Sequence, residues 1–163
     1  MDNTHNDTYA ELFLYFLIQL KGLKGNSLKI MKKSFTRAVR DWSDTKPQVI
    51  SKVVADHFKL NHPNVNPFTV NHRPRKKYGM DIILEHTTPV NVMIKNLMSI
   101  DPTIDEVRRV MLTHTGMAII SRSEDDRLRK MGYSKNRPDG WVDAYSKCNI
   151  TTITEHQYSL PSN

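Results

Sequence analysis

The segment over residues 27–42 constrains the fold most, because its apolar and its charged positions both recur at helical spacing. Its apolar residues recur every three or four positions and predict one buried stripe: Leu28, Met31, Phe35, Ala38 and Trp42. Its cations fall on a different side of the same helix: Lys29, Lys32, Lys33, Arg37 and Arg40. The sequence therefore predicts an amphipathic helix that buries one side and exposes a wholly basic one.

This basic segment dominates the charge of the chain. Residues 21–40 contain seven Lys or Arg and no acid, whereas a helix face that merely contacts solvent usually mixes both signs. The whole chain carries 24 Lys and Arg against 17 Asp and Glu, a net charge of +7. A second basic cluster follows in the arm over residues 73–77. This distribution predicts an anionic partner.

The same periodicities predict the other elements. Helices are predicted over residues 9–20, 47–60, 89–99, 103–112, 124–131 and 139–147, and strands over 78–85, 116–121 and 150–153. This order predicts an α+β fold, a helix-rich single domain with an N-terminal helical region and a small β-sheet. We expect the N-terminal helical region over residues 1–60, a polar basic loop or linker over 61–77, and an α+β region over 78–163.

Composition limits the kinds of site that the chain can form and the compartment in which we expect it. Cys148 is the only cysteine, which excludes an intrachain disulfide and a Cys-based zinc site and favours a reducing, cytoplasmic compartment. The longest apolar stretch, residues 12–20, is too short to cross a bilayer, so we expect no membrane partner. The predicted helix over residues 9–20 is apolar almost all round, which fits a central core position or a homodimer interface equally well.

Two carboxylates and a histidine lie at the end of the predicted strand over residues 78–85. Asp81 and Glu85 are four residues apart, so both fall on one face of an extended strand, and His86 follows directly. Strand ends often present functional side chains to loops. Such a group could bind Mg²⁺ or Mn²⁺ through Asp81 and Glu85, and the histidine could deprotonate water. One hypothesis is therefore a metal-dependent nuclease with Asp81, Glu85 and His86 as catalytic residues.

The run Glu85-His86-Thr87-Thr88-Pro89 resembles the opening of the His-centred (HNH) nuclease motif. The resemblance covers about five residues of the 163, and implies that His86 activates water while Glu85 helps to hold the metal. That family also has an asparagine and another histidine in a strand-then-helix arrangement. In this chain the asparagines that follow His86 are Asn91 and Asn96, and both fall on a predicted helix. The next histidine, His114, is at the end of a different predicted helix.

The same two carboxylates allow two further interpretations. Asp81 and Glu85 are similar to the acidic pair of the PD-(D/E)xK nucleases, but Thr87 stands where that family has a lysine. A purely structural interpretation is also open, because Glu85 could pair with Arg73 or Lys77, or accept hydrogen bonds from the start of the following helix.

The leading hypothesis is a protein that binds DNA or RNA through its basic helix and its basic arm. The predicted contacts are Lys29, Lys32, Lys33, Arg37 and Arg40 on the helix, and Arg73, Arg75, Lys76, Lys77 and Tyr78 in the arm. In the arm, Tyr78 could stack on a base. A third hypothesis is a non-enzymatic interaction or inhibitor protein that docks on an acidic partner. No cofactor is certain, and Mg²⁺ or Mn²⁺ is expected only for the nuclease.

Overall fold

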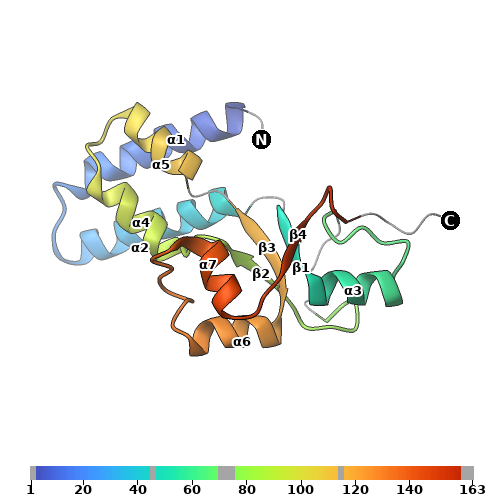
Figure 1. The fold of residues 1–163 in the computed structure, drawn as a ribbon. Coiled ribbons are helices and arrows are strands. Elements are labelled where there is room, and N and C mark those ends of the chain that lie inside the picture. Colours follow the sequence, from blue (N-terminus) through green and yellow to red (C-terminus); the bar gives the residue numbers. More distant parts are fainter. Residues whose placement is uncertain (1–2, 45–46, 70–75, 114–115, 159–163) are drawn as a thin grey trace. The chain divides into compact units, whose positions relative to one another are not determined.

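The computed structural model describes residues 3–44, 47–69, 76–113 and 116–158 (Figure 1). The helices in these ranges are α1 (Asn3–Leu20), α2 (Gly25–Ser43), α3 (Lys52–Asn61), α4 (Val90–Ser99), α5 (Ile104–Thr113), α6 (Arg122–Lys130) and α7 (Gly140–Lys147). The strands are β1 (Val49–Ser51), β2 (Ile82–His86), β3 (Met117–Ser121) and β4 (Thr152–Thr154). The predicted α+β class, with a helix-rich N-terminal region and a small sheet, is confirmed.

The chain forms two compact units. The helical unit comprises residues 1–44 and 88–115, and the sheet unit comprises residues 45–87 and 116–163. The boundaries predicted at residues 60 and 77 stay a prediction, because contacts in the folded state do not show which segments fold on their own. Among the described residues, no helix combines the length and the apolar character that crossing a bilayer requires.

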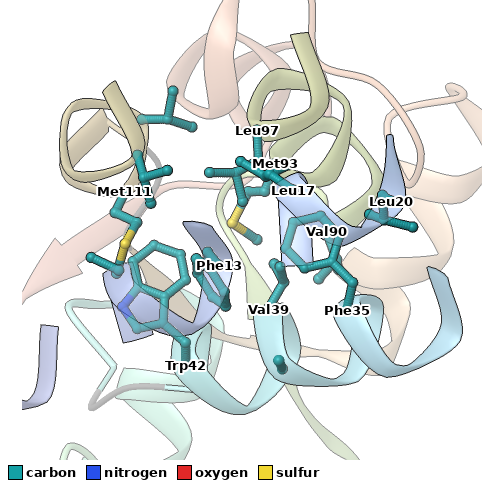
Figure 2. Packing of buried hydrophobic residues seen from close by; sticks show 14 residues of the cluster. Phe13, Leu17, Leu20, Phe35, Val39, Trp42, Val90, Met93, Leu97 and Met111 are labelled. Atoms are coloured by element: carbon teal, nitrogen blue, oxygen red, sulfur yellow. The ribbon is translucent and has the colours of Figure 1, made fainter. Parts of the chain in front are cut away.

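The helical unit is built around an aromatic contact between α1 and α2 (Figure 2). The ring of Phe13 makes T-shaped contacts with Phe35 and with Trp42, each at a centroid distance of 5.7 Å. Such ring pairs contribute about 0.5–1.5 kcal/mol beyond their burial. Helices α4 and α5 complete this core with Val90, Met93, Leu97, Val107, Val110 and Met111. Because Phe35 and Trp42 are two helical turns apart, they fix which side of α2 faces the core.

The sheet unit contains a mixed four-stranded sheet in the order β2-β3-β1-β4. Strand β3 is parallel to β1 and antiparallel to β2, and β4 is antiparallel to β1. Helix α3 packs on one face, where Val54 and Phe58 belong to the same buried cluster as Ile50 and Ile119 of the sheet. Helices α6 and α7 pack on the other face, against a cluster that includes Ile83 and Ile120. The sheet is thus covered on both faces, as parallel strand pairs generally are.

Strand β1 corrects the sequence prediction, which placed residues 47–60 in one helix. Val49 and Ile50 instead pair with Ala118 and Ile119 of β3, and all three residues of β1 are buried. Three residues are too few for alternation to distinguish a strand from the first turn of a helix, so the partner strand decides. The helix then begins one residue after Ser51, whose hydroxyl accepts a hydrogen bond from the Val54 N–H.

Glu124 joins the ends of the parallel strands β1 and β3. Its Oε2 accepts hydrogen bonds from the hydroxyls of Ser51 and Ser121, at 2.7 and 2.9 Å, and from the Ser121 N–H at 2.8 Å. The Ser121 hydroxyl in turn accepts from the Glu124 N–H, which completes a capping box at the start of α6. Ser121 is therefore the N-cap of α6. Charge-assisted bonds of this kind are stronger than neutral ones, and they compensate for burying the carboxylate.

Gly116 provides a test of the packing at the start of β3. A Cβ at this position would clash with the hydroxyl of Thr87, which is buried and donates to the Gly116 carbonyl at 3.1 Å. We expect Gly116→Ala to lower the free energy of unfolding by about 1–3 kcal/mol, measured by urea denaturation. The matched control is Gly22→Ala, because no atom lies within 4 Å of its added Cβ.

A second background isolates the clash. In a Thr87→Ala protein, Gly116→Ala should lower the free energy of unfolding by less than it does in wild type, because the hydroxyl that the added Cβ would meet has been removed. An equal loss of stability in both backgrounds would contradict the assigned contact.

Candidate functional site

The predicted basic side of α2 lies on the protein surface. Five cations of this helix are exposed, and we call them the basic face: Lys29, Lys32, Lys33, Arg37 and Arg40. The opposite side buries Phe35, Ala38, Val39 and Trp42 in the core of the helical unit. At 3.6 residues per turn, the five cations fall within an arc of about 140°. The helix therefore presents its positive charge on one continuous outer surface.

Helix α2 carries five exposed cations against one exposed acid, Asp41. None of the five cations forms an ion pair with another described residue. The arginines of α5, in the same unit, behave differently, because Arg108 pairs with Asp7 at 2.9 Å and Arg109 pairs with Glu106 at 2.6 Å. An uncompensated cluster of cations attracts anions from solution. Ion pairing thus distinguishes the cations of α2 from the two arginines of α5.

The basic arm is only partly described. Arg73 and Arg75 lie outside the described residues, whereas Lys76 and Lys77 are exposed in a turn before β2. The predicted strand over residues 78–85 begins only at Ile82. The two lysines add positive charge to the surface of the sheet unit.

Tyr78 is in the core rather than on the surface. Its exposed fraction is 9%, and its ring packs against Phe58 and His62 at centroid distances of 5.0 and 5.4 Å. Its carbonyl accepts hydrogen bonds from the Nε2 atoms of His57 and His62, at 2.7 and 3.0 Å. A ring enclosed in this way is not available to stack on a base. We therefore leave Tyr78 out of the candidate contact surface.

At the end of β2, Glu85 is held by Arg137, a residue that the sequence pattern does not indicate. Its Oε1 lies 2.5 Å from Nη2 of Arg137, and the side chains of Glu85 and Arg137 are 21% and 2% exposed. Nη1 of Arg137 also donates to the carbonyls of His86 and Thr87. One buried guanidinium thus connects the loop between α6 and α7 to three successive residues of the chain leaving β2.

Asp81 is paired with a different arginine. Its carboxylate lies 3.4 Å from Nε of Arg122, and both side chains are 31% exposed. Arg122 also pairs with Asp125 at 3.1 Å, and Asp125 pairs with Arg129 at 2.8 Å. Asp81 and Glu85 share the sheet face that α6 and α7 cover, as their spacing predicts. Their carboxylates nevertheless belong to two separate ion pairs.

Burial governs the electrostatics of Glu85. It raises the pKa of the Glu85 carboxyl above its usual value, although the Arg137 guanidinium acts in the opposite direction. Burial also raises the pKa of the Tyr145 hydroxyl, and the guanidinium lies 5.5 Å from the centre of the Tyr145 ring. The pair between Glu85 and Arg137 is therefore located where both charges are poorly hydrated, and each depends on the other.

The arrangement does not form a metal-binding group. Within the ranges that the structure describes, no three His, Cys, Asp or Glu side chains are placed to hold one metal ion. His86 is half-buried and opposite Met117 in the sheet. The carboxylates of Asp81 and Glu85 are each engaged by an arginine, whose positive charge disfavours a second cation at the same place. The nuclease hypothesis and its metal stay a prediction.

Comparison with known proteins gave no match. No protein-family model, no curated protein sequence and no solved structure matches the chain. The two nuclease resemblances therefore rest on the quoted residues alone. Support for a function comes from the geometry of the chain itself.

Arg137 escapes sequence reasoning because it lies 52 residues after Glu85 in a loop without periodicity. Arg73 and Lys77 are the partners that proximity in the chain suggests for Glu85. The one available signal is physical, because a carboxylate on a sheet face that packs against helices needs a cation or several donors. That requirement predicts a partner without saying which one.

The pair between Glu85 and Arg137 makes a pH-dependent prediction. The pKa of Glu85 is higher in the folded state than in the unfolded state. Such a carboxyl stabilises the folded state at a pH below its unfolded-state pKa, and this stabilisation is lost as the pH rises through its folded-state pKa. Arg137→Met removes the guanidinium that lowers the Glu85 pKa. The loss of folding stability with rising pH should therefore be larger in this variant than in wild type. We expect destabilisation by about 3–5 kcal/mol near neutral pH and by less near pH 4, measured by urea unfolding.

The double variant Glu85→Gln/Arg137→Met is the control. Its stability relative to wild type should vary less with pH than that of Arg137→Met, because the carboxyl that titrates is absent. An identical loss at both pH values in Arg137→Met would show that Glu85 is not the responsible group.

Proposed function

We propose that this protein binds nucleic acid through the basic face of α2. The observation that carries the proposal is the exposure of five cations on one side of a single helix with no ion pair to other described residues. Solvated helix faces typically mix signs. Nucleic-acid backbones supply the matching dense row of negative charge, at about one phosphate charge per 1.7 Å of duplex axis.

The dimensions of the basic face fit several phosphates. Lys29 and Arg40 are separated by eleven residues of helix, which corresponds to about 16 Å at 1.5 Å per residue. Each lysine can approach a phosphate oxygen as a point charge, and Arg37 and Arg40 can bind one through two N–H groups. Contacts of this type position a protein on the backbone without reading bases. We therefore propose binding with little sequence preference.

Two other anionic partners must be distinguished from nucleic acid. An anionic membrane would have to accept the apolar side of the helix, but that side contains Phe35 and Trp42 and is committed to the core. An acidic protein surface remains an alternative partner for the same cations. It differs from nucleic acid in one measurable respect, because phosphate contacts release condensed counterions and give a steep salt dependence.

The triple variant Lys29→Ala/Lys33→Ala/Arg37→Ala tests the proposal. Wild type should retain labelled DNA or RNA, with log Kd rising steeply as log salt concentration increases. The variant should bind more weakly and lose up to about three from the magnitude of that slope, one for each phosphate contact removed. Fluorescence anisotropy at several salt concentrations measures both quantities.

A charge-matched control separates the basic face from net charge. Lys95→Ala/Arg108→Ala/Arg109→Ala removes three exposed cations from the same helical unit and should leave the slope nearly unchanged. Equal weakening in the two triple variants would contradict a specific role for α2. No retention of any nucleic acid by wild type would reject the proposal and favour the acidic protein partner.

The nuclease alternative is tested in the same reactions. If Asp81, Glu85 and His86 form a catalytic site, Mg²⁺ or Mn²⁺ should produce cleavage that His86→Ala abolishes while binding persists. Persistence of cleavage in purified His86→Ala protein would exclude the proposed role of this side chain.

A further inference from the structure

We propose that the protein forms a symmetric homodimer through the outer face of α1, with the two helices antiparallel. This proposal does not depend on nucleic-acid binding. Helix α1 buries one side in the helical unit through Ala10, Phe13, Leu17 and Leu20. Its other side exposes Leu12, Tyr15 and Ile18, at 37%, 55% and 50%. Isolated apolar residues are common on surfaces, but these three form one continuous stripe.

The outer face of α1 is complementary to itself. Its exposed residues between positions 11 and 19 are Glu11, Leu12, Tyr15, Ile18 and Gln19. These positions are symmetric about Tyr15, at three and four residues on either side. A twofold axis through Tyr15 therefore places Leu12 against Ile18 of the second copy and Glu11 against Gln19, and the reverse contacts form as well. Apolar residues meet at the centre, and an acid meets an amide donor at each edge.

Charge selects the antiparallel orientation. Glu11 is exposed in the N-terminal half of α1, whereas Lys21 and Lys24 are exposed just beyond its C-terminal end. Antiparallel helices bring the acidic half of one copy toward the basic end of the other, and they also oppose the helix dipoles favourably. A parallel pair would place Glu11 beside Glu11 and lysine beside lysine. Both the shape and the charge of this surface thus fit a second copy of the chain.

The expected dimer is weak and leaves α2 available. A single helix pair buries less than the roughly 1,200–2,000 Å² of a standard interface, so association should depend strongly on protein concentration. None of the five interface residues belongs to the basic face, which lies on α2. A dimer would carry two basic faces on one particle, and nucleic acid long enough to reach both would bind more tightly through avidity.

Opposite charges at the twofold axis provide the first test. Tyr15→Glu and Tyr15→Lys each place like charges against one another, so each variant should be monomeric where wild type dimerises, with the dimer Kd raised at least about tenfold. An equimolar mixture of the two should restore dimers. Sedimentation velocity without nucleic acid measures these states, and circular dichroism confirms that each variant is folded. Leu112→Glu, at a 76% exposed site on α5, is the matched control and should dimerise like wild type.

Single cysteines test the register. Cys148 is buried, so an introduced surface thiol is the reactive one. Under mild oxidation Tyr15→Cys should form disulfide-linked dimers, and Leu12→Cys should crosslink with Ile18→Cys but not with itself. Self-crosslinking of Leu12→Cys without the mixed product would overturn the antiparallel register. A monomeric wild type at all concentrations, or a dimer that Tyr15→Glu leaves intact, would overturn the interface itself.

Discussion

The contacts of Phe13 with Phe35 and Trp42 fix the rotation of α2, and the position of the basic face follows from that rotation. Both rings lie on one side of α2 and meet the same buried phenylalanine of α1. A rotation of α2 large enough to bury its cations would expose the two rings. It would also place unpaired charges in an apolar core, which costs several kcal/mol per ion. The hydrophobic side of the helix therefore decides where its charge is displayed.

The end of β2 illustrates how burial can produce the outward signs of a reactive site. Glu85 has a raised pKa and lies beside His86, features that often mark catalytic residues. The physical cause is desolvation, and Arg137 compensates the carboxylate while binding two neighbouring carbonyls. The pair accounts for the position of the loop after α6 without any chemistry.

The success of sequence reasoning depended on how local each feature was. Helix α2 was predictable because its apolar and basic positions repeat over four turns and reinforce one another. Strand β1 was missed because three residues carry no period and pair with β3, far along the chain. The burial of Tyr78 depends on His57 and His62 of the α3 region, and the partner of Glu85 lies 52 residues away. Contacts of that range are set by the tertiary fold, which composition and spacing do not specify.

Chemical footprinting of lysines can show whether α2 contacts nucleic acid with its basic face. The exposed lysines of the protein would be modified in the presence and absence of saturating DNA or RNA, and the sites quantified by mass spectrometry. We expect Lys29, Lys32 and Lys33 to be protected, and Lys95 on α4 of the same unit to remain reactive. Unchanged reactivity of the three α2 lysines in a complex that demonstrably forms would contradict contact through the basic face.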